Sequence, residues 1–276
     1  MEIEFQGDKK QAFISLLLEL QGIVSDTIQN ILDHYGKKHI EPSNWVAIVV
    51  LKRLIESTKA GILLISHDFA RDAAILVTNM MELRLDIQYI ARDHINAQVW
   101  LKHSEASTKP WKVGMLLKEL FKEKNEFEAE KKVYMQFSMV KHGNPVAETF
   151  AFPLAIKDGS LIASPQEDIL LSKLSLFIFT FFTELFRSFK AAAIDFKRCG
   201  FDIKEFETKA DFINMAMQDI QAKNINEQIC LLRKITPIPE LCKSCVVVPE
   251  NHIEITCLLR QKEHADNFSC EKYKSK

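Results

Sequence analysis

The residues best suited to chemistry in this sequence lie on one predicted helix, between positions 67 and 92. Glu82 and Asp86 lie one helical turn apart, so each carboxylate should raise the pKa of the other unless a cation lies between them. His67 and Arg71 are also four residues apart, at the start of the same predicted helix. At about 100° per residue, both carboxylates belong to a narrow polar stripe centred on Glu82. The polar stripe consists of Arg71, Thr78, Glu82, Asp86, Tyr89 and Asp93.

The polar stripe has two explanations at the level of sequence. The simpler one is a solvent-facing stripe, which any surface helix has. The other is a partly buried cluster that lines a cleft, with Asp86 and His67 as candidate ligand-binding residues and Glu82 and Arg71 as candidate catalytic residues. Apolar residues recur along another side of the helix at spacings of four and three, which predicts a seam against a second helix. The seam consists of Phe69, Ala73, Leu76, Met80, Leu83, Ile87 and Ile90.

A second candidate group ends the predicted helix 111–141. Tyr134, Ser138 and His142 are spaced by four, so they share a face if the helix reaches residue 142. Gly143, Asn144 and Pro145 then stop the helix. A histidine at such a junction is either a C-cap partner or a catalytic group at the edge of a cleft. We therefore add Tyr134 and His142 to the candidate catalytic residues and Asn144 to the ligand-binding ones.

Glycine and proline are scarce, with eight of each among 276 residues. That is about half of their usual share, and a β-sandwich or barrel needs a turn every 8–12 residues or so. The composition therefore favours a mainly α protein, and 47% hydrophobic residues suffice for a core. Residues 118–132 are dense in charge and predict a solvated helix face with a Glu128–Lys132 pair. We expect helices over residues 9–35, 44–65, 67–92, 93–105, 111–141, 167–198 and 204–222.

Two regions depart from this helical pattern. Asp158-Gly159 lies between short apolar runs and predicts a β-hairpin insertion at about 145–165. Beyond residue 223 the periodicity weakens, and residues 246–248 and 253–259 are typical of strands. We therefore expect a helical bundle domain over 1–222 and a small mixed C-terminal appendage over 223–276.

The appendage holds five of the six cysteines. Cys242 and Cys245 form a CxxC, although no second CxxC follows. A structural zinc site needs two more ligands, and the candidates are Cys257 and Cys270, with His252 and His264 as alternatives. The alternative is ordinary thiols, because the chain carries neither an export signal nor a membrane span and is expected in the cytoplasm. The most apolar stretch, residues 174–183, has only ten uncharged residues and predicts a buried helix instead of a membrane segment. We expect no other cofactor.

Several common catalytic signatures are absent from the sequence. It contains no GxxxxGK[ST], GxGxxG, HExxH or GxSxG motif, and no Glu-x-x-His that would favour a dimetal bundle. The 36 basic and 37 acidic residues exclude a uniformly basic surface, although a local nucleic-acid patch stays open. The phenylalanines of the helix 167–198 are expected to pack in the core; they are Phe177, Phe179, Phe181, Phe182 and Phe186.

The segment SHDFARDAAILVTNMMELRLDIQYIARD, followed some fifty residues later by YMQFSMVKHGNP, resembles the helical family called domain of unknown function 5677. That family is similar to the HEPN group of small helical-bundle proteins. The resemblance covers about residues 45–200 and implies a HEPN-like bundle. The Glu of the family pattern matches Glu82 and its His-Gly/Ser-x-Pro ending matches residues 142–145, whereas Thr78 stands where the family usually has Arg.

HEPN ribonucleases carry an Arg and a His with four to six residues between them, and no arginine of this chain has a histidine at that spacing; Arg260 and His264 come closest, with three residues between them. The resemblance therefore favours a protein that acts by binding, as a scaffold or sensor in stress or antiviral defence, and that forms a homodimer through apolar helices. The first alternative is a metal-independent ribonuclease with a relocated site of Arg71, Glu82, Tyr134 and His142. The second is a toxin-like component of a two-gene system. We expect an RNA or protein partner and no membrane.

Overall fold

The structure is a computed structural model, and it divides into two compact units. The first unit comprises residues 1–152 and 166–217, and the second comprises residues 153–165 and 218–276. The residues that the structure describes are 9–36, 38–67, 69–105, 109–142, 154–157, 160–163 and 167–235.

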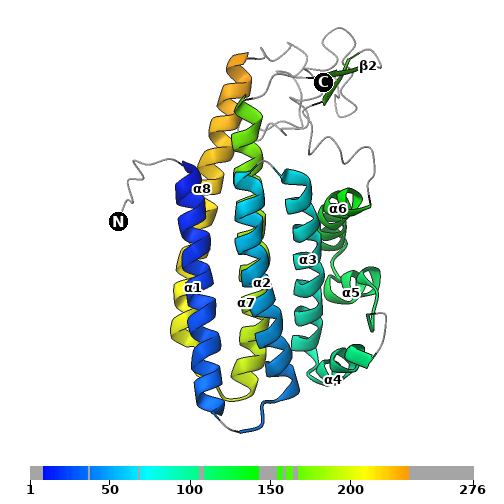
Figure 1. Cartoon of the computed structure of the whole chain (residues 1–276), viewed down its shortest axis with the longest axis vertical. Helices are drawn as coiled ribbons and strands as arrows, with labels where there is room; N and C mark the ends of the chain where they lie inside the picture. The colour runs from blue at the N-terminus through cyan, green and yellow to red at the C-terminus, as the bar shows by residue number, and fades with distance from the viewer. Residues whose placement is uncertain are drawn as a thin grey trace, which may run out of the picture. The chain divides into compact units, whose positions relative to one another are not determined.

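Long helices dominate the first unit, which confirms the mainly α class. In Figure 1, α1, α2, α7 and α3 run alongside one another, and the shorter α5 and α6 lie along α3. No helix in the described part of the chain combines the length and apolar character needed to cross a membrane. The helices are α1 (Lys9–Tyr35), α2 (Pro42–Ser66), α3 (Ala70–Arg92), α4 (Ile95–Leu101), η1 (Lys102–Glu105), α5 (Val113–Leu120), α6 (Lys124–Lys141), α7 (Glu167–Arg198) and α8 (Lys204–Ile235).

The bounds of α1 and α7 agree with the sequence prediction, and a glycine follows each helix. Gly36 has φ 52° and its N–H donates to the Leu32 carbonyl at 2.9 Å. Gly200 has φ 88° after the end of α7. Glycine adopts this left-handed conformation without steric cost, so it is the natural residue at the end of a helix.

The prediction of a single helix over residues 111–141 is wrong, because the structure has two helices there, α5 and α6. The backbone is extended at Phe121 (φ −115°, ψ 96°) and again at Glu123 (φ −74°, ψ 128°). Arg92 of α3 donates to the carbonyls of Glu119 and Leu120, at 2.5 Å each, and so satisfies groups left open where α5 ends. A side chain distant in sequence stabilises this break between the two helices. No glycine or proline stands at the break, so the local sequence does not predict it.

Two other predicted helices also differ. The expected helix 93–105 is α4 followed by the 3-10 helix η1, and α3 begins at Ala70 instead of residue 67. The helix expected to end at residue 222 continues as α8 to Ile235, because no glycine or proline interrupts the chain before Pro237.

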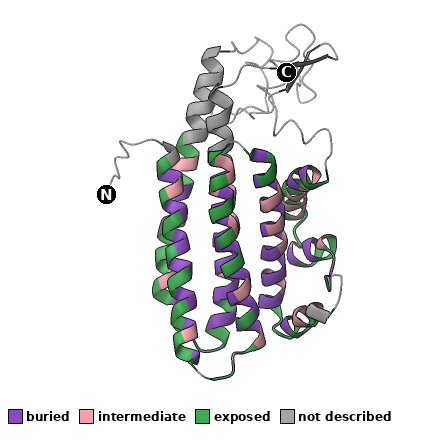
Figure 2. Ribbon diagram, in the orientation of Figure 1, coloured by how far each residue is buried: buried purple, intermediate pink, exposed green. Residues whose placement is uncertain are grey.

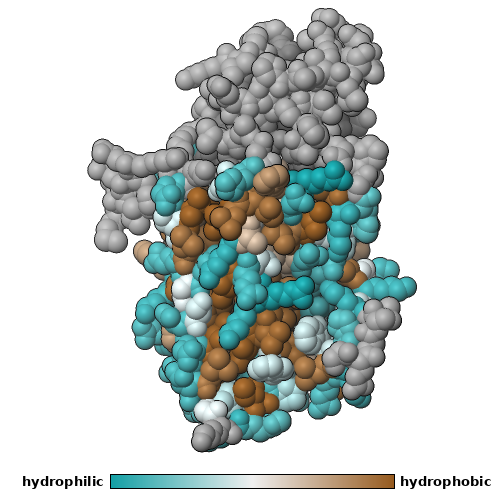
Figure 3. All heavy atoms as spheres, viewed as in Figure 1, coloured by the Kyte–Doolittle hydropathy of each residue, from teal (hydrophilic) through white to brown (hydrophobic). Residues whose placement is uncertain are grey.

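Buried residues lie on the inner faces of the long helices (Figure 2). Phe177, Phe181 and Phe182 of α7 are at most 1% exposed, as expected for core residues, whereas Phe179 and Phe186 are half-buried. On the face seen in Figure 3, apolar side chains gather where α1, α2 and α3 lie, and polar side chains cross between them.

The second unit contains two short strands in the region where the sequence predicts a hairpin. Strands β1 (Leu154–Lys157) and β2 (Ser160–Ala163) pair antiparallel, with Leu154 opposite Ala163 and Lys157 opposite Ser160. Asp158 and Gly159 lie outside the described residues, as do the strands expected at 246–248 and 253–259.

Candidate functional site

The central part of the polar stripe is buried, so the solvent-facing explanation is wrong there. Thr78 is fully buried and Asp86 is 2% exposed, while the Glu82 side chain is 14% exposed. The two ends of the stripe, Arg71 and Asp93, are exposed. The predicted seam of α3 is buried at Ala73, Met80, Leu83, Ile87 and Ile90, and half-buried or exposed at Leu76 and Phe69.

Three donors surround the Glu82 carboxylate. Lys109 Nζ lies 3.0 Å from Oε2, Lys141 Nζ lies 3.3 Å from Oε1, and the Tyr134 hydroxyl donates to Oε1 at 3.2 Å. Burial alone would raise the pKa of Glu82, but the hydrogen bonds and charges of Lys109 and Lys141 outweigh it, so the pKa is lowered. Burial and the negative charge of Glu82 raise the pKa of Tyr134. Glu82 is therefore held as a carboxylate.

Two tryptophans hold the Asp86 carboxylate. Trp111 Nε1 donates to Oδ1 at 2.7 Å and Trp100 Nε1 donates to Oδ2 at 3.3 Å. Lys109 Nζ is 3.7 Å from the same Oδ2, so this lysine is the cation between the two carboxylates. Burial raises the pKa of Asp86 by more than Lys109 and the two indoles lower it.

Three segments position these groups around α3. Trp100 comes from α4, Lys109 and Trp111 from the segment before α5, and Tyr134 and Lys141 from α6. Buried indole N–H groups need an acceptor, and Asp86 supplies one for both. We call this group the Glu82–Asp86 cluster; its members are Glu82, Asp86, Trp100, Lys109, Trp111, Tyr134 and Lys141.

The structure therefore brings together Glu82, Asp86 and Tyr134 among the predicted site residues. His142 is exposed directly after α6, and its backbone N–H donates to the Ser138 carbonyl at 3.2 Å. Within the described residues, no hydrogen bond or ion pair joins the His142 side chain to Glu82. Asn144 lies outside the described residues.

The prediction that His67 and Arg71 share one helix is wrong. His67 ends α2, where its backbone N–H donates to the carbonyls of Leu63 and Leu64, and α3 begins only at Ala70. Arg71 lies in the first turn of α3, eleven residues before Glu82. That separation is about 16 Å along the helix axis, so Arg71 belongs to a different region of α3 from the Glu82–Asp86 cluster.

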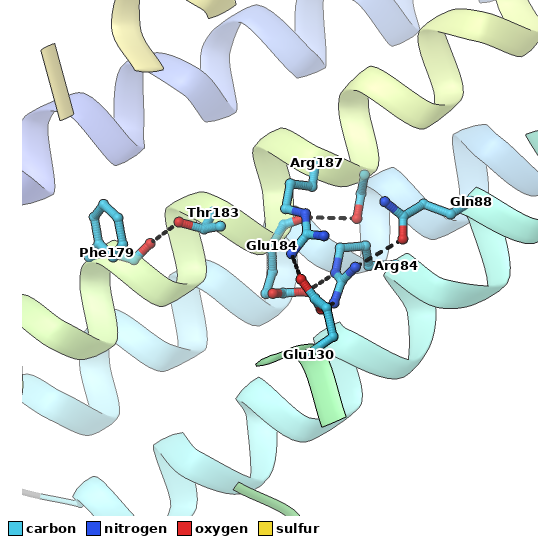
Figure 4. A network of polar contacts seen from close by, with 8 residues as sticks. Arg84, Gln88, Glu130, Phe179, Thr183, Glu184 and Arg187 are labelled. Carbon is cyan, nitrogen blue, oxygen red and sulfur yellow. Dashed lines mark hydrogen bonds and ion pairs between the residues drawn. The ribbon is translucent and has the colours of Figure 1, made fainter. Parts of the chain in front are cut away.

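A second polar group, which the sequence pattern did not predict, is centred on Arg84. This side chain is fully buried, and Figure 4 shows it between α3, α6 and α7. Its Nε donates to Glu184 at 2.6 Å, while its two terminal nitrogens donate to Glu130 at 2.7 Å and Gln88 at 2.9 Å. Arg187 donates to the other oxygen of Glu130. We call these five residues the Arg84 network.

Charges balance within the Arg84 network. Burial would lower the pKa of Arg84, but Glu184 and Glu130 outweigh burial and raise it. Burial likewise acts to raise the pKa of Glu130, and Arg84 and Arg187 outweigh it, so that pKa is lowered. The network contains two arginines and two glutamates, and it joins α3, α6 and α7. Glu130 was expected on the solvated face of residues 118–132 but points inward, while Glu128 lies 3.9 Å from Lys131 instead of pairing with Lys132.

One signal for the Arg84 network is present in the sequence. Arg84 lies between Leu83 and Leu85, and Glu184 interrupts the apolar run of residues 174–186. An arginine between two leucines and a glutamate within an apolar stretch of another helix predict a buried pair, since an unpaired buried charge is very costly. For the Glu82–Asp86 cluster, the comparable signal is two tryptophans that flank Lys109.

Metal-ligand groups are not found among the residues that the structure describes. The proposed zinc ligands Cys242, Cys245, Cys257 and Cys270 lie outside these residues. Cys199, which follows α7, is a free thiol whose pKa is raised by burial and by the charge of Asp195. A raised pKa disfavours the reactive thiolate form.

Comparison with family models, curated proteins and solved structures found no match for this chain.

Proposed function

We propose that this chain is a HEPN-like helical protein that acts by binding, as a scaffold or sensor in stress or antiviral defence. The observation that carries the proposal is the pairing of Glu82, whose carboxylate contacts Lys109, Lys141 and Tyr134. A general base works best when its pKa lies near the working pH, and the lysines lower the pKa of Glu82 further from neutrality.

Asp86 supports the same proposal. Each of its oxygens accepts from one indole N–H, so Asp86 joins α3 to α4 and to the segment before α5, as Glu82 joins α3 to α6. The relocated ribonuclease site needs His142 next to Glu82, and the described contacts do not include that pair. The homodimer, the RNA or protein partner and the toxin-like role stay predictions.

Labelled RNA distinguishes binding from catalysis. We expect purified protein to leave transfer, ribosomal and single-stranded RNA intact, with or without the substitution His142→Ala. His39→Ala is the matched control, because His39 is exposed between α1 and α2. Cleavage by the parent and by His39→Ala, but not by His142→Ala, would overturn the proposal in favour of the ribonuclease. Retention of intact RNA on the protein in a gel-shift assay would support binding.

A further inference from the structure

A groove of about 620 Å³ lies in the first unit, away from the Glu82–Asp86 cluster. Its walls come from the end of α3, the residues where α5 ends, the C-terminal half of α7 and the start of α8. Ligand pockets in proteins have volumes of roughly 300–1,000 Å³, so the groove has the size of a small-molecule site. We call it the basic groove, after the four cations in its lining: Arg92, Arg187, Lys190 and Lys197.

Apolar side chains make up half of the groove's lining. Phe121 and Phe186 supply half-buried aromatic rings, and Ile194, which is 52% exposed, lies on α7 between Lys190 and Lys197. Residues 190, 194 and 197 are spaced by four and three, so they share one face of α7. Leu120, Ala91 and Ala191 complete the apolar lining. A ligand that fits this lining therefore has an apolar body.

The charge of the lining is positive. Glu207 is the one carboxylate among the lining residues, against four cations, which leaves a formal charge of +3. Glu130 pairs with Arg187 and Asp211 pairs with Lys190 from outside the lining, and counting both leaves +1. Arg92 donates to two backbone carbonyls, which carry no formal charge. The cations therefore exceed the anions around the groove.

We propose that the basic groove binds a small amphiphilic anion, in which a carboxylate, sulfonate or phosphate is joined to an apolar or aromatic body. The amino groups of Lys190 and Lys197 meet the anion. Both also pair with Glu207, at 3.4 Å and 3.0 Å, so this one carboxylate is shared between two cations. Ile194 with the two phenylalanines covers the body. Inorganic phosphate would leave the apolar lining uncovered, and a neutral apolar molecule would leave the excess positive charge unmatched. This inference rests on the proposed binding role and adds a ligand class to it.

Dye binding tests the proposal on the full chain. Anilinonaphthalene sulfonate carries both features, phenylnaphthylamine lacks the anion, and inorganic sulfate lacks the apolar body. We expect the sulfonate dye to bind at one site at least about tenfold more tightly than the neutral dye, and sulfate to displace it poorly. The double substitution Lys190→Gln/Lys197→Gln and the single substitution Ile194→Ser should each weaken sulfonate binding about tenfold.

Matched controls exist on α8. Lys204→Gln/Lys209→Gln removes two exposed charges outside the lining, and Met215→Ser removes an exposed apolar side chain outside it. Thermal unfolding checks that every variant folds, which is expected because exposed ion pairs stabilise little. Equal binding by the groove variants and the controls, or equal affinity for the two dyes, would overturn the proposal.

The natural ligand could be a free molecule or a membrane lipid. Displacement of the dye by monomeric decanoate supports the free molecule, and co-sedimentation with phosphatidylglycerol vesicles that Lys190→Gln/Lys197→Gln abolishes supports the lipid. The proposal would be overturned if decanoate did not displace the dye and the protein did not co-sediment with the vesicles. If the protein cleaved RNA and His142→Ala abolished the cleavage, the proposed binding role would be overturned while dye binding stayed unchanged. Failure of the proposed function is therefore distinguishable from failure of the ligand proposal.

Discussion

Arg84 is a charged residue in the core, so its neighbours must compensate its charge. Its guanidinium is fully buried and contacts Glu184 at 2.6 Å and Glu130 at 2.7 Å. Replacing a whole buried ion pair by apolar residues is often tolerated, whereas removing one partner leaves a buried charge without compensation. Single and double variants of the Arg84 network can therefore separate the effect on stability of removing one charge from the effect of removing the whole ion pair.

The first prediction is that Arg84→Met lowers the free energy of unfolding by about 3–5 kcal/mol. The reason is that Glu184 then stays buried without its cation. Urea unfolding followed by circular dichroism measures the loss. Adding Glu184→Met should restore part of the stability, because the double variant buries no unpaired charge at position 184.

Arg53→Met on α2 is the control, because Arg53 is exposed. It should change stability by less than about 0.5 kcal/mol. A loss in Arg84→Met no larger than that of the control would show that the network does not stabilise the bundle.

Among the elements, α2 and α7 approach each other closely at Gly61, which the sequence did not predict. A Cβ atom added at Gly61 would lie 2.4 Å from Cζ of Phe181, so the absence of a side chain at 61 lets the ring pack against α2. Glycine inside a helix normally costs about 1 kcal/mol relative to alanine. Here the close packing of Phe181 explains why glycine stands in the middle of a helix.

We therefore predict that Gly61→Ala destabilises the protein by about 1–3 kcal/mol, because the new methyl group overpacks the contact. Gly22→Ala on α1 is the matched control, since nothing lies within 4 Å of its added Cβ. That control should be neutral or stabilise by up to about 1 kcal/mol. Thermal unfolding of both variants compares them directly.

Phe181→Leu in the Gly61→Ala background provides a further check, because the smaller side chain should reduce the clash. Gly61→Ala behaving like Gly22→Ala, with the same gain in thermal stability, would contradict the proposed packing between α2 and α7.

For the whole molecule, the net charge of −1 includes carboxylates whose pKa values are shifted in opposite directions in the folded protein. Burial opposes the charge of Glu130, but Arg84 and Arg187 prevail and lower its pKa, whereas burial prevails at Asp86 and raises its pKa. Stability from Glu130 is thus present above its unfolded pKa and is lost as the pH falls through the lower folded pKa. Stability from protonated Asp86 is present at low pH and is lost as the pH rises through its higher folded pKa.

The pH dependence of unfolding tests this assignment through Glu130→Gln. The difference in free energy of unfolding between wild type and this variant should be constant near neutral pH and should narrow as the pH falls below about 4.5. Urea unfolding between pH 7 and pH 3.5 measures it. Glu128→Gln, at an exposed position on the same helix, should show a small difference at every pH. A Glu130→Gln difference that widens in acid would contradict the lowered pKa.

The sequence by itself determined the helical class, the bounds of α1 and α7 and most of the buried seam of α3, because hydrophobic periodicity and helix-ending glycines act over a few residues. Tertiary structure alone decided which polar groups meet. Glu82 lies 27 residues from its partner Lys109 and 52 residues from its partner Tyr134. Arg84 lies 100 residues from its partner Glu184. Such contacts depend on how the helices pack, and so does the break at Phe121, which the distant Arg92 stabilises.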